Sequence, residues 1–73
     1  MGKLPALSGR EVCAILSVHG FAEVRRRGSH IVMQRPDAAG TRTVIVPDHA
    51  DVRIGTLQSI IRQAGLTRAA FER

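Results

Sequence analysis

Apolar residues near the start of the chain recur at the spacing of a helix. One stripe, three and four positions apart, is formed by Val12, Ile15, Leu16 and His19. Ser8 and Glu11 stand at the positions of a capping box, in which the serine hydroxyl caps the first turn and the glutamate carboxylate reaches back. Gly20 suits the left-handed conformation that ends many helices. The pattern predicts a helix over residues 9–19.

The middle of the chain alternates between apolar and polar residues, which is typical of strands. The alternation predicts three of them, over residues 21–27, 29–35 and 41–46. Gly28 permits a tight turn between the first two strands, and the Pro, Asp and Gly of residues 36–40 are a strong turn signal between the last two. These strands are therefore expected to pair as consecutive hairpins.

The same alternation assigns the two faces of each strand. In the second strand, Ile31 and Met33 are expected to face the core. In the first strand, Ala22 and Val24 are expected to do so. The outward positions are then Glu23, Arg25, Arg27, His30, Val32 and Gln34.

A second helix is predicted after an irregular loop over residues 48–54. It begins at Gly55 or the residue before it and continues to about Ala64, where Gly65 ends it. Its apolar face consists of Leu57, Ile60, Ile61 and Ala64. Thr67 is expected to cap a short last turn that brings Phe71 into the core.

The order of elements is therefore α-β-β-β-α. This order predicts an α+β fold with a three-stranded antiparallel sheet and two helices on one face of it. Double-stranded-RNA-binding domains have this architecture. With 73 residues, the chain is long enough for one domain and too short for two, so a single domain over residues 1–73 is expected.

The charge of the chain favours a polyanionic partner. Eleven Lys and Arg stand against six Asp and Glu, a net charge of +5, and ten of the eleven cations are Arg. Guanidinium groups bind phosphate in a bidentate fashion and stay charged at physiological pH. The only aromatic residues are Phe21 and Phe71, so base stacking on aromatic side chains can contribute little.

Other function classes find little support in the composition. The single cysteine, Cys13, cannot form an internal disulfide, and no His, Cys or carboxylate spacing predicts a metal site. We expect no cofactor. Met1–Ala6 carries no long apolar stretch, so neither a signal peptide nor a membrane span is expected, and the cytoplasm is the expected location.

The residue most suited to catalysis is His30. It opens a short strand, faces away from the predicted core, and follows three consecutive arginines and a tight turn. Nearby positive charge favours the neutral imidazole, which is the form that a general base needs. RNA supplies its own nucleophile, the 2′-hydroxyl, so such a base could cleave RNA without a metal. The alternative is an exposed strand histidine that only hydrogen-bonds a neighbour.

The other two histidines have simpler interpretations. His19 is expected to act as a cation at the C-terminal end of the first helix. His49 follows the third strand in the segment Val46-Pro47-Asp48-His49. It could be a second acid or base, but a role in holding the loop is favoured on chemistry alone.

Three motifs in order make the chain resemble a known family. These are Leu7-Ser8-Gly9-Arg10-Glu11-Val12 with His19-Gly20-Phe21, then Gly28-Ser29-His30, and then Val46-Pro47-Asp48-His49 with the segment Ile54–Leu66. The chain resembles the HicA toxins of bacterial toxin–antitoxin pairs, also called YcfA-like proteins. The resemblance covers nearly the whole length. Members of this family commonly carry an aromatic residue just after the histidine of the Gly-Ser-His motif. This chain departs from that pattern, because no aromatic residue follows His30.

The resemblance implies a double-stranded-RNA-binding-like fold, cleavage of mRNA and a HicB-type antitoxin that covers the site. It also implies that His30 is catalytic. The residues expected to bind RNA are Arg25, Arg26, Arg27, Gly28, Ser29, Arg42 and His49. Two other functions remain open: a non-catalytic RNA-binding module that holds phosphates with the same arginines, or a protein that only docks a partner.

Overall fold

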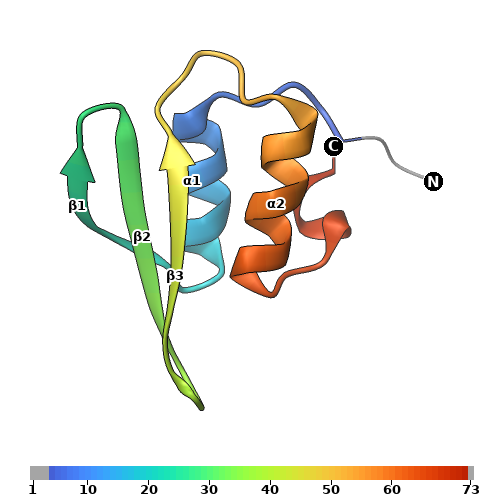
Figure 1. Ribbon diagram of the computed structural model, residues 1–73. Coiled ribbons are helices and arrows are strands. Elements are labelled where there is room, and N and C mark those ends of the chain that lie inside the picture. Colours follow the sequence, from blue (N-terminus) through green and yellow to red (C-terminus); the bar gives the residue numbers. More distant parts are fainter. Residues whose placement is uncertain (1–3, 73) are drawn as a thin grey trace.

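Three antiparallel strands form a sheet whose one face is covered by both helices (Figure 1). A computed structural model describes residues 4–72. The elements are α1 (Gly9–Val18), β1 (Ala22–Arg27), β2 (His30–Asp37), β3 (Gly40–Pro47), α2 (Ile54–Ala64) and a 3₁₀ helix, η1 (Arg68–Phe71). The order α-β-β-β-α and the α+β arrangement confirm the expected fold class. None of the helices within this described part is both long and apolar enough to cross a membrane.

Both helices begin and end close to the predicted positions. The capping box of α1 is present: the Glu11 N–H donates to the Ser8 hydroxyl at 3.1 Å, and the Ser8 N–H donates to the Glu11 carboxylate at 3.0 Å. Gly20 and Gly65 follow α1 and α2 with φ of 92° and 68°, so both adopt the positive φ that glycine tolerates best. Thr67 precedes η1, but its side chain makes no capping hydrogen bond, and that part of the prediction is wrong.

The strand β1 departs from the predicted alternation. Its pairing with β2 shifts between Glu23 and Arg25, which leaves Val24 as an extra residue without a partner. A bulge of this kind bends an edge strand and breaks the two-residue period. Val24 is consequently 50% exposed and Ala22 is exposed as well. The expectation that these two residues face the core is wrong.

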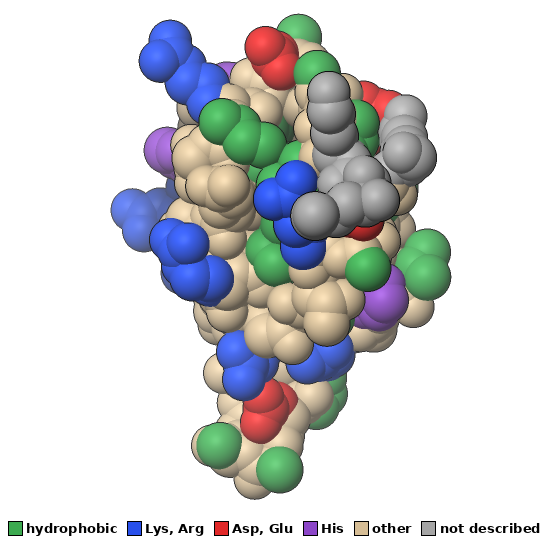
Figure 2. Space-filling model, turned by 90° about the vertical axis from the view of Figure 1, so that its right-hand side faces the viewer, with side chains coloured by type: hydrophobic (Ala, Val, Ile, Leu, Met, Phe, Trp, Pro, Cys, Tyr) green, Lys and Arg blue, Asp and Glu red, His purple; other side chains and the backbone are tan. Residues whose placement is uncertain are grey.

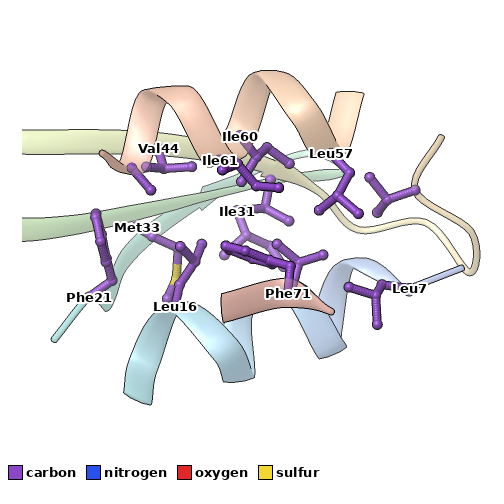
Figure 3. Packing of buried hydrophobic residues seen from close by; sticks show 14 residues of the cluster. Leu7, Leu16, Phe21, Ile31, Met33, Val44, Leu57, Ile60, Ile61 and Phe71 are labelled. Carbon is purple, nitrogen blue, oxygen red and sulfur yellow. The ribbon is translucent and has the colours of Figure 1, made fainter. Parts of the chain in front are cut away.

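The core lies between the sheet and the helices (Figure 3). The sheet contributes Ile31 and Met33, as predicted, and β3 adds two valines. Phe71 of η1 is fully buried and lies among side chains of both helices and the sheet. The hydrophobic core cluster consists of Leu7, Val12, Leu16, Phe21, Ile31, Met33, Val44, Val46, Val52, Leu57, Ile60, Ile61, Ala64 and Phe71. Val32, on the opposite face of the sheet, is also buried, with 6% of its surface exposed.

The first turn of α1 packs directly against the backbone at the end of β3. A side-chain carbon on Gly9 would collide with the carbonyl oxygen of Pro47 and would lie 2.9 Å from the Cα of Asp48. The Gly9 N–H donates to the carbonyl of His49 at 2.9 Å. Only glycine fits at position 9, because any side chain would overlap the backbone of Pro47 and Asp48. The same contact holds the segment that carries His49 in place.

We expect Gly9→Ala to lower the free energy of unfolding by about 1–3 kcal/mol, because the added methyl group meets backbone atoms that cannot move aside easily. Gly55→Ala is the matched control in the first turn of α2, where nothing lies within 4 Å of the added carbon. It should raise stability by up to about 1 kcal/mol, since alanine favours a helix over glycine. Urea unfolding of both variants measures the difference. Equal effects would show that the close approach is unimportant.

Candidate nucleic-acid interface

His30 lies on the face of the sheet that no helix covers. In the strand register, Arg27, His30 and Pro47 stand opposite one another, and so do Arg25, Val32 and Ile45. Opposite residues of an antiparallel pair share a face of the sheet. Arg25, Arg27 and His30 therefore lie on the open face together, as the alternation around His30 predicted.

Two hollows adjoin on this open face, and His30 and Ile45 line both of them. The first has a volume of about 660 Å³ and is lined by Arg27, Gly28, His30, Val32 and Ile45. The second, of about 370 Å³, is lined by His30, Ile45, Pro47, His49, Asp51, Val52, Arg53 and Thr56. Both volumes lie in the range of small-molecule sites. The imidazole of His30 thus stands between two spaces, each large enough for part of a nucleotide.

The turn before His30 is held in place by Asp48. Gly28 has a φ of 59°, which allows the two-residue turn between β1 and β2. The Asp48 N–H donates to the Ser29 carbonyl at 2.6 Å. The Asp48 carboxylate accepts a hydrogen bond from Arg26 and lies 3.8 Å from Nε of Arg10. Asp48 therefore joins the turn at residues 28–29 to the end of β3, and its side chain is also paired with Arg26 of β1 and Arg10 of α1.

These contacts set the charge of the Asp48 carboxylate. The hydrogen bond from Arg26, together with the positive charge of Arg26, Arg10 and His49, holds the pKa of Asp48 below its usual range. Partial burial works in the opposite direction and is outweighed. The same hydrogen bond raises the pKa of Arg26. Asp48 is thus a carboxylate that holds structure, with its side chain only 18% exposed.

The structure separates the arginines that the sequence grouped together. Arg26 is opposite Ile31, on the helix-covered side of the sheet, and pairs with Asp48. Arg42 donates to the carboxylate of Asp37 and to the carbonyl of Gln63, each at 3.0 Å, far along β3 from the turn at residues 28–29. Arg25 and Arg27 alone of these four lie on the open face. The open face therefore carries two of the four arginines that the sequence predicted for RNA binding.

The remaining predicted site residues divide between backbone and side-chain roles. Gly28 lines the first hollow and His49 the second, while Ser29 contributes its carbonyl to the link with Asp48. His19 is exposed at the end of α1, where its carbonyl accepts a hydrogen bond from Arg35 at 3.1 Å.

Sequence reasoning did not single out Arg53 and Thr56, which line the second hollow. Arg53 directly precedes α2, and Thr56 lies in its first turn. The irregular loop after β3 places both residues in the same hollow as His30. The sequence shows only that a charged residue, Arg53, stands directly before the second predicted helix. That position does not indicate which residues lie near it in the fold.

Charge alone does not locate the interface. Figure 2 shows the side of the molecule that carries α2, and Arg side chains are spread over it among hydrophobic and acidic ones. Within residues 4–72, no three His, Cys, Asp or Glu side chains gather in a group that could hold a metal ion. What distinguishes the open sheet face is the combination of a histidine, two arginines and adjoining hollows.

Fold and site together define a small α+β protein of the double-stranded-RNA-binding architecture, with a histidine on the open face of its sheet. The family model of the HicA toxin of bacterial toxin–antitoxin systems matches residues 9–66 of the 73-residue chain. The chain therefore belongs to the HicA toxin family, as its motifs suggested, and membership implies an antitoxin partner. A comparison with curated proteins finds no match.

We expect Asp48→Asn to be less stable than the wild type at neutral pH, because the substitution removes the charge that pairs with Arg26. A depressed pKa in the folded state means that this stabilisation is present above the ordinary aspartate pKa of about 3.9 and is lost as the pH falls through the lower folded value. The difference between the two proteins should therefore shrink in acid. Thermal unfolding at neutral and acidic pH measures it.

Asp51→Asn is the control for this prediction. Asp51 lies in the same loop and is exposed, and within residues 4–72 its side chain makes no hydrogen bond or ion pair. The control should unfold like the wild type at each pH. A difference for Asp48→Asn that stays constant with pH would contradict the assigned role of the carboxylate.

Proposed function

We propose that this toxin is a metal-independent endoribonuclease that cleaves mRNA, with His30 as the general acid–base group. The observation that carries the proposal is the place of His30: it is exposed on the open face and adjoins Arg27, between two hollows that can each receive part of an RNA strand. Family membership supports a toxic activity, and RNA cleavage is an activity that this geometry can perform.

The proposed reaction uses the nucleophile that RNA carries. The imidazole of His30 takes the proton from a 2′-hydroxyl, and the 2′-oxygen attacks the adjacent phosphorus. The bond from phosphorus to the 5′-oxygen of the next nucleotide breaks, and the leaving oxygen takes up one proton to become a hydroxyl group. The products are a 2′,3′-cyclic phosphate and a 5′-hydroxyl end, and no redox change occurs. A positioned acid or base contributes about 10²–10⁴-fold to such a step.

Arg25 and Arg27 are the proposed phosphate contacts on the open face. Arg27 stands beside His30 in the strand register, so its guanidinium can stabilise the negative charge that grows on the phosphoryl oxygens. The floor of the first hollow is aliphatic, formed by Val32 and Ile45. A base can be held there by apolar contact, without the aromatic stacking that this chain lacks.

The proposed partner is an antitoxin of the HicB type that covers the open face. This face is basic, and Ile45 is 50% exposed on it, so an acidic partner with apolar side chains fits both features. Such a partner would exclude RNA from His30 by occupying the same surface. Cleavage of mRNA under this control would take place in the cytoplasm.

We expect His30→Ala to lose cleavage of single-stranded mRNA by about 10²–10⁴-fold while keeping the wild-type fold, because the side chain is exposed. The assay uses toxin freed of antitoxin, with EDTA present, and gel analysis of the products. His19→Ala is the matched control, since His19 is also an exposed histidine but lies at the far end of α1. It should cut like the wild type.

Two outcomes would overturn the proposal. Full activity of His30→Ala would remove His30 from the reaction. Folded wild-type protein that binds RNA but leaves it intact would identify a non-catalytic RNA-binding module, and protein that neither binds nor cuts would identify a partner-docking role.

We expect Arg27→Ala, made in the inactive His30→Ala background, to weaken RNA binding and to reduce the slope of log affinity against log salt by about one. Arg62→Ala removes the same charge from the last turn of α2, on the helical side of the molecule. It should leave the slope nearly unchanged. Binding titrations at several salt concentrations measure the slopes, and equal slopes would mean that binding depends on net charge alone.

A further inference from the structure

His49 shares the second hollow with His30, and the backbone holds the two residues near each other. Ser29 and Asp48, the residues directly before them, are joined by the 2.6 Å hydrogen bond from the Asp48 N–H. His30 also stands opposite Pro47 in the sheet, two positions before His49. Both residues line the same hollow of about 370 Å³. The pair is therefore brought together by the tertiary structure, although nineteen positions separate the residues in sequence.

The loop does not need the ring of His49 to keep its shape. The backbone carbonyl of His49 accepts the hydrogen bond from Gly9, and the side chain of Asp48 makes the ion pairs. Within residues 4–72, the His49 imidazole is exposed and makes no hydrogen bond. The backbone of His49 is thus held by its hydrogen bond to Gly9 of α1, while its ring stays available to a ligand in the hollow.

The proposed cleavage needs a second proton transfer that His30 cannot perform in the same step. While His30 removes the 2′-proton, the 5′-oxygen leaves on the opposite side of the phosphorus, because attack and departure are roughly in line. An alkoxide is a poor leaving group unless a proton reaches it. A second imidazole that shares the hollow with the first can supply that proton.

We propose that His49 is the general acid of this ribonuclease, a role that rests on the function proposed above. The scissile phosphate lies in the second hollow between the two rings, and Arg53 on its wall supplies positive charge to the phosphoryl oxygens. The imidazolium of His49 donates its proton to the 5′-oxygen as the P–O5′ bond breaks. After the step His30 holds the 2′-proton and His49 is neutral, and exchange with water restores both.

The assignment also sets the direction of the RNA strand. The nucleotide that supplies the 2′-hydroxyl lies on the His30 side, with its base toward the first hollow and the aliphatic floor of Val32 and Ile45. The nucleotide that leaves with the 5′-hydroxyl lies on the His49 side. Any base preference at the first of these positions is therefore expected to depend on Val32 and Ile45.

The test uses a leaving group that needs no proton. A cut site is first mapped in an mRNA, and two short RNAs around it are synthesised, one with the ordinary 5′-oxygen and one with sulfur in its place. A thiolate leaves readily because a thiol such as that of cysteine has a pKa of about 8.5, far below that of an alcohol. We expect His49→Ala to slow cleavage of the oxygen substrate by about 10²–10⁴-fold. It should cleave the sulfur substrate at close to the wild-type rate.

Two further variants make the result specific. His49→Gln keeps a polar side chain but cannot deliver a proton in this way, so it should behave like His49→Ala even if the alanine variant folds poorly. His30→Ala should be slow on both substrates, since the 2′-proton must be removed in either case. Arg53→Ala should slow both substrates by a similar factor.

Each outcome decides a separate claim. If both His49 variants are slow on both substrates, His49 binds or orients RNA and is not the general acid. If neither variant is slow on the oxygen substrate, His49 has no part in the reaction. If the wild type cuts neither RNA, or His30→Ala cuts both normally, the proposed ribonuclease function fails, and the role of His49 fails with it.

Discussion

The hydrogen bond between Asp48 and Ser29 is the interaction on which the geometry of the open face depends. It joins the β1–β2 turn to the end of β3, and the carboxylate of Asp48 extends the link to Arg26 and Arg10. β1 is an edge strand with a bulge and exposed side chains along its whole length, so its own packing restrains it little. Asp48 and the close approach of α1 at Gly9 supply the missing restraint, and His30 begins directly after the turn that they hold.

This arrangement leaves the side chains of the candidate site exposed on a surface whose backbone is held by hydrogen bonds. His30 and Arg27 lie at the ends of strands, and His49 lies on a backbone segment bonded to Gly9, while the hydrophobic core cluster lies on the other face of the sheet. A domain of this size buries a modest fraction of its surface and could not enclose a site within its core. The function proposed above accordingly uses an open face, which an RNA strand can cross and a partner protein can cover.

The arginines illustrate how one residue type is divided between structure and binding. Arg26 and Arg42 are engaged with carboxylates and carbonyls, and Arg35 lies 4.7 Å from the ring centre of Phe21 while bonding the end of α1. The bonds from Arg42 to Gln63 and from Arg35 to His19 hold the sheet to the helices, while those to Asp48 and Asp37 hold the strands and their connections together. Arg25 and Arg27 alternate with Arg26 on β1 and face the other way, toward the open surface. Arginines on one face of the sheet therefore stabilise the fold, while Arg25 and Arg27 on the other face are the ones assigned to RNA in the proposed function.

The sequence by itself determined the elements, because local physics controls them. The capping box at Ser8, the glycines that end the helices and the apolar stripe of α2 are short-range patterns, and all were predicted. The motif around His30 likewise indicated the family. Alternation failed in β1, because a bulge breaks the two-residue period and an edge strand is not obliged to bury its apolar residues. Which arginines remain free, and that His49 and Arg53 share a hollow with His30, were decided only by the tertiary structure. Those neighbours are joined by contacts across the chain, among them Gly9 against Pro47 and Asp48 against Ser29, and no local spacing encodes such contacts.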